Sequence, residues 1–337
     1  MTTSTVIDPG RLNLLGSSPR FSGVVEQIRR IAQVDAAVLI EGETGTGKEL
    51  AARAMHYLGP RAGRPFVPIN CGALAENIVE SELFGHRRGA FTDAKSEAAG
   101  LISEANGGTL FLDEVDALPV KAQAALLRFI QDKTFRPVGG GQMKQAQLRI
   151  VAASNADLDQ LAKSRHFRND LYYRLSVLRL RMPALREREN DVLDLARIFL
   201  ERLNHQYQPH PLKKLHPEFV EFIRQYAWPG NVRELENVIQ REFLMCAPDN
   251  EWIRLDQDGQ STHSHEASVP DDMPFKTAKA NAIAEFELRY VSRLLQQTSG
   301  NITHAARIAG HDRSAFSKLV RKHKLSAGVP VAPDTAE

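Results

Sequence analysis

The sequence predicts an α/β fold, in which helices cover a parallel sheet, followed by a smaller all-helical part. Short β-rich apolar runs alternate with amphipathic stretches up to Pro183, and such alternation indicates a parallel sheet with helices on both faces. After Pro183 the helical periodicity continues without further strand patterns. The runs that we expect to form strands are Ala37–Glu41, Pro65–Asn70, Thr109–Asp113, Leu148–Ser154 and Val177–Met182.

Amphipathic helices are predicted both between the strands and behind them. Val120–Lys133 should cover the sheet, because its apolar residues recur at helical spacing on one face. Three further helices are expected after the last strand, at Asn190–Gln206, His216–Trp228 and Asn231–Cys246.

The composition is that of a soluble globular protein large enough for two domains. The chain has 337 residues, of which 42% are apolar and 25% charged. Its two cysteines, Cys71 and Cys246, form no CxxC pair, so neither a disulfide framework nor a cysteine-rich metal site is indicated. The sequence shows no leader pattern and no apolar run of membrane-spanning length. We therefore expect a cytoplasmic protein without a membrane partner.

A glycine-rich loop follows the first predicted strand. Gly42-Glu43-Thr44-Gly45-Thr46-Gly47-Lys48 precedes the predicted helix Glu49–Tyr57, which is the setting of a phosphate-binding P-loop. Its backbone N–H groups and the helix N-terminus should bind phosphates, and Lys48 should reach the β- and γ-phosphates. Glu49 stands where the general pattern has Ser or Thr, so one Mg²⁺ ligand must come from elsewhere. The loop predicts ATP and Mg²⁺ as cofactors.

Two carboxylates end the third predicted strand. Asp113 and Glu114 follow the apolar run Thr109–Leu112, and ligands of an open α/β sheet bind at the carboxyl ends of its strands. Asp113 suits Mg²⁺, directly or through water. Glu114 suits activation of the attacking water. The sequence therefore predicts a site for nucleotide hydrolysis.

Five motifs resemble the central domain of bacterial enhancer-binding proteins, the AAA+ activators of sigma-54 RNA polymerase. The similarity covers about Leu15–Cys246, and GETGTGKE is similar to that family's own Walker A loop, which accounts for Glu49. The motifs are GETGTGKE (Gly42–Glu49), ESELFGHRRGAFTDA (Glu80–Ala94), GGTLFLDEV (Gly107–Val115), FRNDLYYRLSV (Phe167–Val177) and WPGNVREL (Trp228–Leu235).

The resemblance implies roles for further residues. It implies that Asn70 holds Glu114 in a nucleotide-dependent switch, and that Asn155 is the residue called sensor I. Arg233 matches sensor II, on a helical lid. Arg168 and Arg174 match arginines that reach the ATP of a neighbouring subunit. It follows that the chain should assemble, from DNA-bound dimers, into a ring that is expected to be a hexamer.

The segment GAFTDA resembles the family's surface loop, whose Phe and Thr contact sigma-54. Phe91 and Thr92 are kept here, but Asp93 replaces the second glycine of the family motif. Activation of sigma-54 polymerase is the favoured interpretation. One alternative is a AAA+ DNA-binding regulator, including a repressor, that does not remodel sigma-54. A remodeller of another target, with the C-terminal helices as an interaction module, is the third hypothesis.

The C-terminal end is basic and resembles a Fis-type helix-turn-helix domain. The segment from Lys276 to Lys324 contains ten Lys and Arg residues but three Asp and Glu residues. This excess of positive charge fits either a nucleic-acid contact or a solvated helical face. Within Gly300–Leu325, Asn301 or Thr303 can cap one helix, Gly310 permits a turn and Asp312 can cap a second helix. The candidates for base contacts are Arg313, Ser314 and Ser317, and those for phosphate contacts are Lys318, Arg321 and Lys322.

The expected organisation has six parts. They are a short N-terminal segment (1–14), the AAA+ α/β ATPase subdomain (15–183), the helical lid subdomain (184–255), a linker (256–273), the Fis-type DNA-binding domain (274–326) and a disordered tail (327–337). The short first segment leaves no room for a sensory domain. We therefore expect regulation by a partner protein in trans, by expression level or by another chain.

Overall fold

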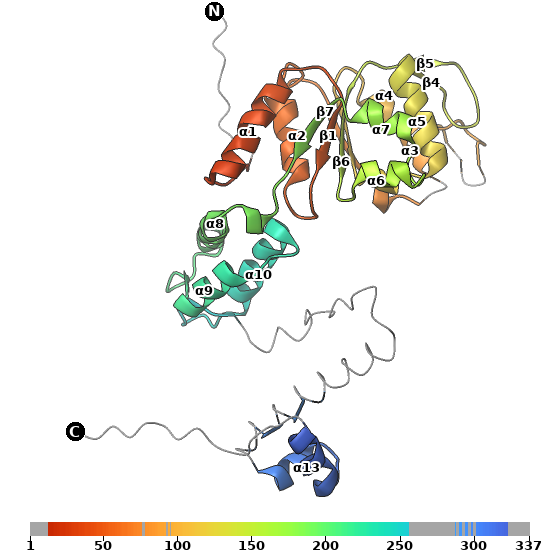
Figure 1. Ribbon diagram of the computed structural model, residues 1–337. Coiled ribbons are helices and arrows are strands. Elements are labelled where there is room, and N and C mark those ends of the chain that lie inside the picture. Colours follow the sequence, from red (N-terminus) through yellow and green to blue (C-terminus); the bar gives the residue numbers. More distant parts are fainter. Residues whose placement is uncertain are drawn as a thin grey trace, which may run out of the picture. The chain divides into compact units, whose positions relative to one another are not determined.

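The computed structural model describes residues 13–75, 78–91, 94, 96–255, 287, 290, 291, 294, 295, 298 and 301–322. The chain forms two compact units, Met1–Leu255 and Asp256–Glu337, which are described separately (Figure 1). Among the residues that the structure describes, none of the helices has the length and apolar character needed to span a bilayer.

The first unit is built on a parallel sheet of five strands in the order β2-β3-β6-β1-β7. These strands are β1 (Val38–Glu41), β2 (Phe66–Asn70), β3 (Thr109–Asp113), β6 (Arg149–Ser154) and β7 (Leu178–Arg181). All five predicted strands are confirmed, each within one residue at either end. β6 is buried along its whole length, as expected for a central strand of a parallel sheet covered on both faces.

Helices cover both faces of this sheet. Figure 1 shows α1 (Pro19–Ala32) and α2 (Lys48–Tyr57) on one side of the strands, and α5 (Val120–Asp132) on the other. β3 serves both layers because successive side chains of a strand point to opposite faces. Phe111 packs in the cluster of α1 and α2, whereas Leu110 packs in the cluster of α5.

Shorter elements complete the α/β part. The helices α3 (Val79–Phe84), α4 (Leu101–Glu104), α6 (Leu158–Lys163) and α7 (Asn169–Leu175) accompany the antiparallel pair of β4 (Thr134–Phe135) and β5 (Lys144–Gln145). The prediction of Val120–Lys133 as a helix is confirmed, and Ala122, Leu126 and Phe129 lie on its buried face.

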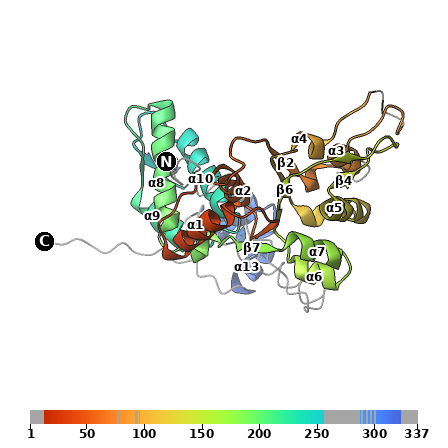
Figure 2. The ribbon, with the colours of Figure 1, turned by 90° about the horizontal axis from the view of Figure 1, so that it is seen from above.

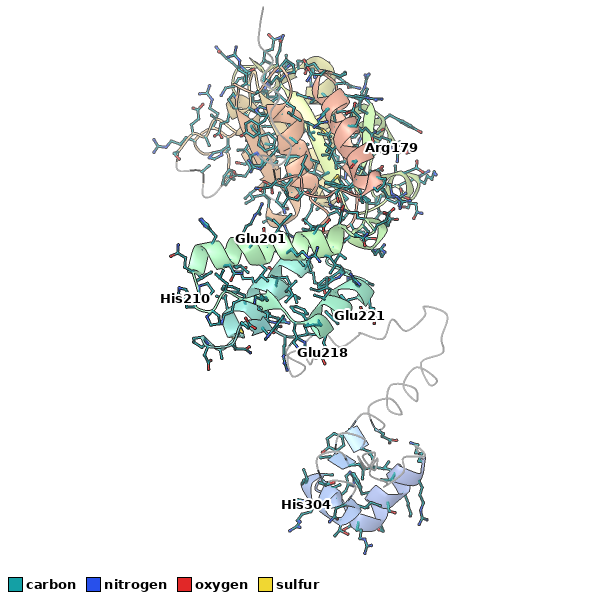
Figure 3. All side chains as sticks on the ribbon, turned by 90° about the vertical axis from the view of Figure 1, so that its left-hand side faces the viewer. Arg179, Glu201, His210, Glu218, Glu221 and His304 are labelled. Carbon is teal, nitrogen blue, oxygen red and sulfur yellow. The ribbon has the colours of Figure 1, made fainter. Side chains whose placement is uncertain are left out.

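The lid consists of α8 (Asp191–Tyr207), α9 (Pro217–Gln225) and α10 (Asn231–Met245), which Figure 2 shows grouped together beside the sheet. In Figure 3, Glu201 marks α8, and Glu218 and Glu221 mark α9. The helix predicted over His216–Trp228 is longer than the helix in the structure, α9, which ends at Gln225. Its end at Gln225 frees Trp228 to bury its indole in the lid core and donate a hydrogen bond from Nε1 to the Ile223 carbonyl, 2.9 Å away.

The prediction that strands stop after Pro183 was wrong in one detail. β8 (Lys214–Leu215) and β9 (Trp252–Ile253) form a parallel pair within the lid. Each has only two residues, which is too short for an alternating pattern to appear in the sequence.

The described residues of the second unit pack around one small core. α12 (Ile302–Ile308) is capped by Asn301, whose Oδ1 accepts hydrogen bonds from the N–H groups of Thr303 and His304. Gly310 has φ +65° in the turn before α13 (Arg313–Lys322). The core residues are Val291, Leu294, Leu295, Ala305, Ala306, Phe316 and Val320. The predicted linker, the tail and most of residues 274–300 lie outside the described residues, and the helix-turn-helix assignment stays a prediction.

Candidate nucleotide site

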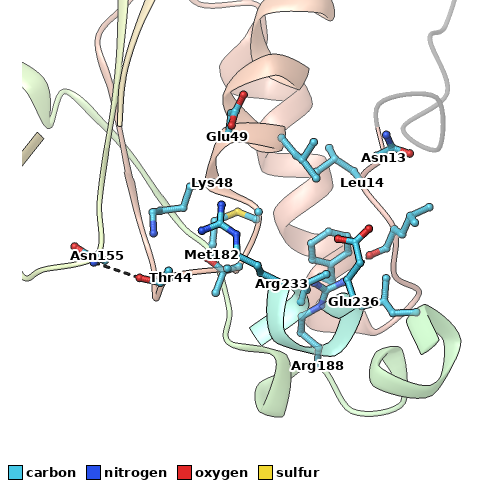
Figure 4. A pocket seen from close by; sticks show the side chains of 18 of the residues that line it. Asn13, Leu14, Thr44, Lys48, Glu49, Asn155, Met182, Arg188, Arg233 and Glu236 are labelled. Atoms are coloured by element: carbon cyan, nitrogen blue, oxygen red, sulfur yellow. Dashed lines mark hydrogen bonds between the residues drawn. The ribbon is translucent and has the colours of Figure 1, made fainter. Parts of the chain in front are cut away.

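A pocket of about 400 Å³ lies between the carboxyl edge of the sheet and the lid (Figure 4). Many of the predicted nucleotide-site residues line it. Those from the α/β part are Thr44, Gly45, Thr46, Gly47, Lys48, Glu49, Asp113, Glu114 and Asn155, and Arg233 comes from the lid. Because β6 lies between β1 and β3, the ends of these three strands bring their polar side chains to one place.

The glycine-rich loop has a conformation that its glycines make possible. Gly45 and Gly47 have φ angles of +78° and +93°, which residues other than glycine rarely adopt. A Cβ on Gly45 would also lie 2.2 Å from the Gly230 carbonyl oxygen. The loop therefore needs glycine at this position both for its backbone conformation and for its contact with the lid.

Lys48 is oriented by the loop itself. Its Nζ donates to the carbonyl oxygens of Gly42 and Glu43 at 2.7 and 3.0 Å. Burial lowers the pKa of the Lys48 ammonium, and the negative charge of Asp113 opposes this shift. The loop thus keeps a half-buried cation beside the pocket, where it can meet an anionic ligand.

Glu49 does not replace the Ser or Thr hydroxyl that the general P-loop pattern has at this position. Its Oε1 accepts hydrogen bonds from Arg53 Nε and Nη2 at 2.9 and 2.7 Å. Figure 4 shows its carboxylate pointing away from Lys48 and Thr44. The expectation that a metal ligand must come from another residue or from water therefore remains a prediction.

The two carboxylates at the end of β3 have different surroundings. Burial raises the pKa of Asp113, although its Oδ1 accepts a hydrogen bond from the Glu114 N–H at 3.1 Å. Glu114 adopts the left-handed conformation with φ +52°, and its Oε2 would lie 2.3 Å from a Cβ on Gly72. The Glu114 carboxylate is thus packed against the backbone that follows β2.

Asn70 holds the same stretch of backbone through hydrogen bonds. Its Oδ1 accepts hydrogen bonds from the N–H groups of Gly72 and Ala73 at 2.8 and 3.0 Å. In the part of the chain that the structure describes, no hydrogen bond joins Asn70 directly to Glu114. Asn70 instead reaches Glu114 through Gly72, and its switch role stays a prediction.

Asn231 fastens the lid to the phosphate-binding loop, and our sequence reasoning missed it. This fully buried side chain donates from Nδ2 to the Thr44 carbonyl at 3.0 Å and to Glu43 Oε2 at 3.1 Å. The Val232 N–H donates to the Gly45 carbonyl at 3.1 Å. The motif WPGNVREL carried the signal, but only Arg233 was singled out from it.

The other end of the pocket is largely apolar, and our sequence reasoning missed it too. Its lining includes the apolar residues Leu14, Leu15, Phe21, Leu195 and Phe199, together with the polar residues Asn13, Arg202 and Glu236. These apolar side chains come from the segment before α1, from α1 and from α8. Beneath them the buried ion pair Arg188–Asp191 measures 2.9 Å, and the Arg188 guanidinium lies 3.7 Å from the centre of the Phe21 ring. No sequence motif indicated this end of the pocket.

Arg168 and Arg174 lie outside the pocket lining. Arg174 is exposed on α7. Arg168 donates from Nε and Nη2 to the two carboxylate oxygens of Asp170, at 3.0 and 2.8 Å. The structure therefore does not bring these two arginines to the pocket of their own chain.

The GAFTDA loop is described only in part. Phe91 is 40% exposed, and its ring centre lies 4.9 Å from that of His86. The N–H of Ala94 donates to the Phe91 carbonyl at 3.0 Å, which closes the loop tightly. Thr92 and Asp93 lie outside the described residues.

The predicted DNA-contact residues lie on α13. Arg313, Ser314, Lys318, Arg321 and Lys322 are exposed, and Ser317 is half-buried. Lys322 Nζ donates to Glu287 Oε2 at 2.6 Å, so this lysine is already paired within its own unit. All six assignments stay predictions.

The P-loop, the carboxylates at the end of β3 and the helical lid define a AAA+ P-loop protein. Residues 14–181 match the family model of the sigma-54 interaction domain, and residues 186–271 match that of the AAA+ ATPase lid domain. The chain is 42% identical over 313 residues to the transcriptional regulatory protein GlrR of Escherichia coli K12, covering 92% of this chain and 68% of the relative. It therefore belongs to the family of sigma-54-dependent transcriptional activators, and the predicted resemblance is confirmed.

Other relatives agree with this assignment. The Nif-specific regulatory protein of Azotobacter vinelandii is 47% identical over 232 residues, which cover 69% of this chain and 44% of that protein. The crystal structure of NtrX from Brucella abortus has a TM-score of 0.69 at 29% identity, covering 94% of this chain and 70% of that one. A further NtrX structure, a complex with ATP, has a TM-score of 0.68. The chain spans about two thirds of the length of GlrR. The similarity to NtrX and the match to the lid domain confirm the predicted α/β fold with a helical lid.

Proposed function

We propose that this chain binds ATP with Mg²⁺ in the pocket beside Lys48 and uses hydrolysis to remodel the sigma-54 RNA polymerase closed complex. The observation that supports this most is the convergence of the phosphate-binding loop, the β3 carboxylates and the lid residue Arg233 on one pocket. In this proposal Lys48 and Arg233 bind phosphate oxygens, and Glu114 accepts the proton of the attacking water.

The residues present fit a magnesium ion. Asp113 lines the pocket, and its carboxylate accepts a hydrogen bond from the backbone N–H of Glu114. No cluster of three or more His, Cys, Asp and Glu side chains suitable for a metal occurs among the described residues. Mg²⁺ typically uses one or two carboxylates together with substrate phosphates and water. Asp113 would hold the ion, which neutralises phosphate charge when bound.

Arg168 and Arg174 are proposed to act on the ATP of the neighbouring subunit. An arginine that stabilises the charge of a transferring phosphoryl group is worth roughly 10³–10⁵ in rate. If both act in trans, a monomer should be nearly inactive. In a dilution series, the specific ATPase activity should decrease once the protein concentration is below the range in which the ring assembles. Specific activity that stays constant on dilution below the assembly range would contradict the assignment in trans.

The target of the motor is tested with the loop residue Asp93. We expect sigma-54 polymerase to form open complexes with this protein and ATP, and an Asp93→Gly variant to behave similarly. Permanganate footprinting of a sigma-54 promoter measures the melted DNA, and Lys48→Ala is the matched negative control. Open complexes with the variant alone would instead support a regulator that does not remodel sigma-54, an alternative that the family relationship does not favour.

The C-terminal unit is proposed to bind upstream DNA through α13. Replacing a phosphate-contacting cation should weaken binding to all sequences and flatten the salt slope by about one unit. We expect this for Arg321→Ala, and a smaller change for Lys322→Ala because Glu287 already pairs with that lysine. Fluorescence anisotropy over a salt series measures both slopes, and an unchanged slope for Arg321→Ala would remove this residue from the phosphate contacts.

A further inference from the structure

A short series of side-chain hydrogen bonds runs along the carboxyl edge of the sheet, beside the nucleotide pocket. Ser154, the last residue of β6, is fully buried, and its Oγ lies 2.6 Å from Asp116 Oδ1. The N–H of Ala156 donates to the same Oγ at 3.1 Å. An O–H···O⁻ distance near 2.6 Å is typical of a charge-assisted hydrogen bond. The hydroxyl proton of Ser154 therefore points to Asp116, and its oxygen accepts from Ala156.

This series joins the ends of three neighbouring strands. Asp116 lies in the 3-10 helix Val115–Ala117, just after the carboxylates that end β3. Asn155 follows Ser154 at the end of β6 and donates from Nδ2 to Thr44 Oγ1, 3.3 Å away in the loop after β1 (Figure 4). The strands β3, β6 and β1 are adjacent in the sheet. Asp116 thus connects the strand of Glu114 to the turn that carries Asn155.

We propose that Asp116 is a positioning residue of the ATPase site, which acts through Ser154 to hold Asn155 against the phosphate-binding loop. Asp116 lies outside the pocket lining, whereas Asn155 and Thr44 lie within it. Its effect on bound nucleotide is therefore indirect. The inference rests on the proposed hydrolysis of ATP at this pocket.

The physical reason is the precision that a phosphate contact requires. A misplacement of about 1 Å can cost roughly 100-fold in rate, and the Ser154–Ala156 turn sets where the Asn155 amide lies. Without Asp116 the Ser154 hydroxyl can still donate to the Ala156 carbonyl oxygen, 3.0 Å away. That bond would leave no buried donor unpaired, but it would remove the connection to the end of β3. Loss of Asp116 should therefore disturb the turn more than the stability of the fold.

The test compares steady-state kinetics of the full chain and its variants, at a concentration above the assembly range. We expect Asp116→Ala and Ser154→Ala each to lower kcat about 10-fold, with the KM for ATP and the calorimetric Kd for ADP changed less than about twofold. Asp116→Asn should retain most activity, because its amide oxygen can still accept the Ser154 hydroxyl. Asp132→Ala, at an exposed aspartate that ends α5, is the matched control and should resemble the wild type.

A double-mutant cycle separates positioning from a general structural effect. If Asp116 acts through Asn155, adding Asp116→Ala to Asn155→Ala should reduce kcat little further. An unchanged kcat for Asp116→Ala in an active protein would overturn the inference and leave the proposed function standing. Full additivity with Asn155→Ala, or an equal loss in Asp116→Asn, would also overturn it. A wild-type chain without ATP hydrolysis at any concentration would overturn the proposed function and the inference together.

Discussion

The two ends of the pocket are built in different ways. The phosphate end uses a glycine-rich loop and polar side chains at the ends of adjacent strands, such as Lys48, Asp113 and Asn155. The other end, which we call the apolar end, includes the apolar residues Leu14, Leu15, Phe21, Leu195 and Phe199. Chemistry at the phosphate end needs particular residue types at fixed spacing. The apolar end needs apolar surface and a means to hold three separate segments together.

A buried ion pair supplies that means. Asp191 accepts hydrogen bonds at Oδ1 from the N–H groups of Ser17 and Ser18, at 2.7 and 2.8 Å. Arg188, next to it, donates from Nη2 to the Leu15 carbonyl at 2.6 Å. The pair therefore joins the lid to the segment that carries Leu14 and Leu15. The comparison indicates that activity depends most on the phosphate end, and stability most on the apolar end.

Breaking the ion pair should have the largest effect on stability. Asp191→Ala would leave the buried Arg188 charge without its carboxylate, and such changes typically cost about 3–5 kcal/mol. We expect a correspondingly lower free energy of unfolding by urea denaturation. Asp194→Ala is the matched control, because this exposed aspartate accepts only a 3.3 Å hydrogen bond from Ser17 Oγ together with a weak ion pair. A loss below about 1 kcal/mol for Asp191→Ala would show that the apolar end is held by its apolar contacts alone.

At the phosphate end, Lys48→Ala should reverse this pattern. Losing a preorganised cation at the phosphates should reduce kcat/KM for ATP roughly 10²–10³-fold. The free energy of unfolding should change little, because Lys48 donates only to loop carbonyls. Measurements of ATPase activity and urea denaturation on the same preparation check both expectations. Strong destabilisation with partial activity would remove the distinction between the two ends.

The same difference explains what could be predicted from the sequence. The glycine-rich loop and Asp113 were predicted because strand patterns placed them at one edge of a parallel sheet, whereas Asn155 was predicted from the resemblance to enhancer-binding proteins. The contacts of Asp191 with Ser17 and Ser18 join residues that lie 174 and 173 positions apart. No periodicity or motif in the sequence marks such a contact, because Ser and Asp are common residue types and these residues meet only after the lid has packed.

Helix ends show a second limit of sequence reasoning. The helix predicted to end at Trp228 ends at Gln225 because the Trp228 side chain is buried in the lid core. Tertiary packing decides that boundary, and an apolar pattern alone continues through it. Asn231 was missed for a related reason, since its contacts with Glu43 and Thr44 depend on where the lid rests.

Leu14→Ala tests whether the apolar end contributes to nucleotide affinity. Leu14 is buried and lines the pocket, so shortening its side chain should weaken binding by roughly 1 kcal/mol, about fivefold in KM for ATP. The kcat should change less than twofold, since the interaction is equal in the ground state and the transition state. Leu212→Ala, at an exposed leucine of the lid, is the control. A fall in kcat without a change in KM would place Leu14 in the hydrolytic step.

The smallest expected effect concerns Glu43, where the phosphate-binding loop meets the lid. Hydrogen bonds from Arg186 and then Asn231 lower the pKa of Glu43 from 4.5 to about 2. A depressed carboxyl pKa contributes stability that is present above the unfolded value and lost as the pH falls towards the folded value. Because this ion pair is nearly half exposed, we expect Glu43→Gln to cost less than about 1 kcal/mol at pH 7. The difference between variant and wild type, measured by urea denaturation from pH 7 to pH 3, should shrink below about pH 4.5. A difference that stays constant over this range would mean that Glu43 stabilises the lid by hydrogen bonding alone, independently of its charge.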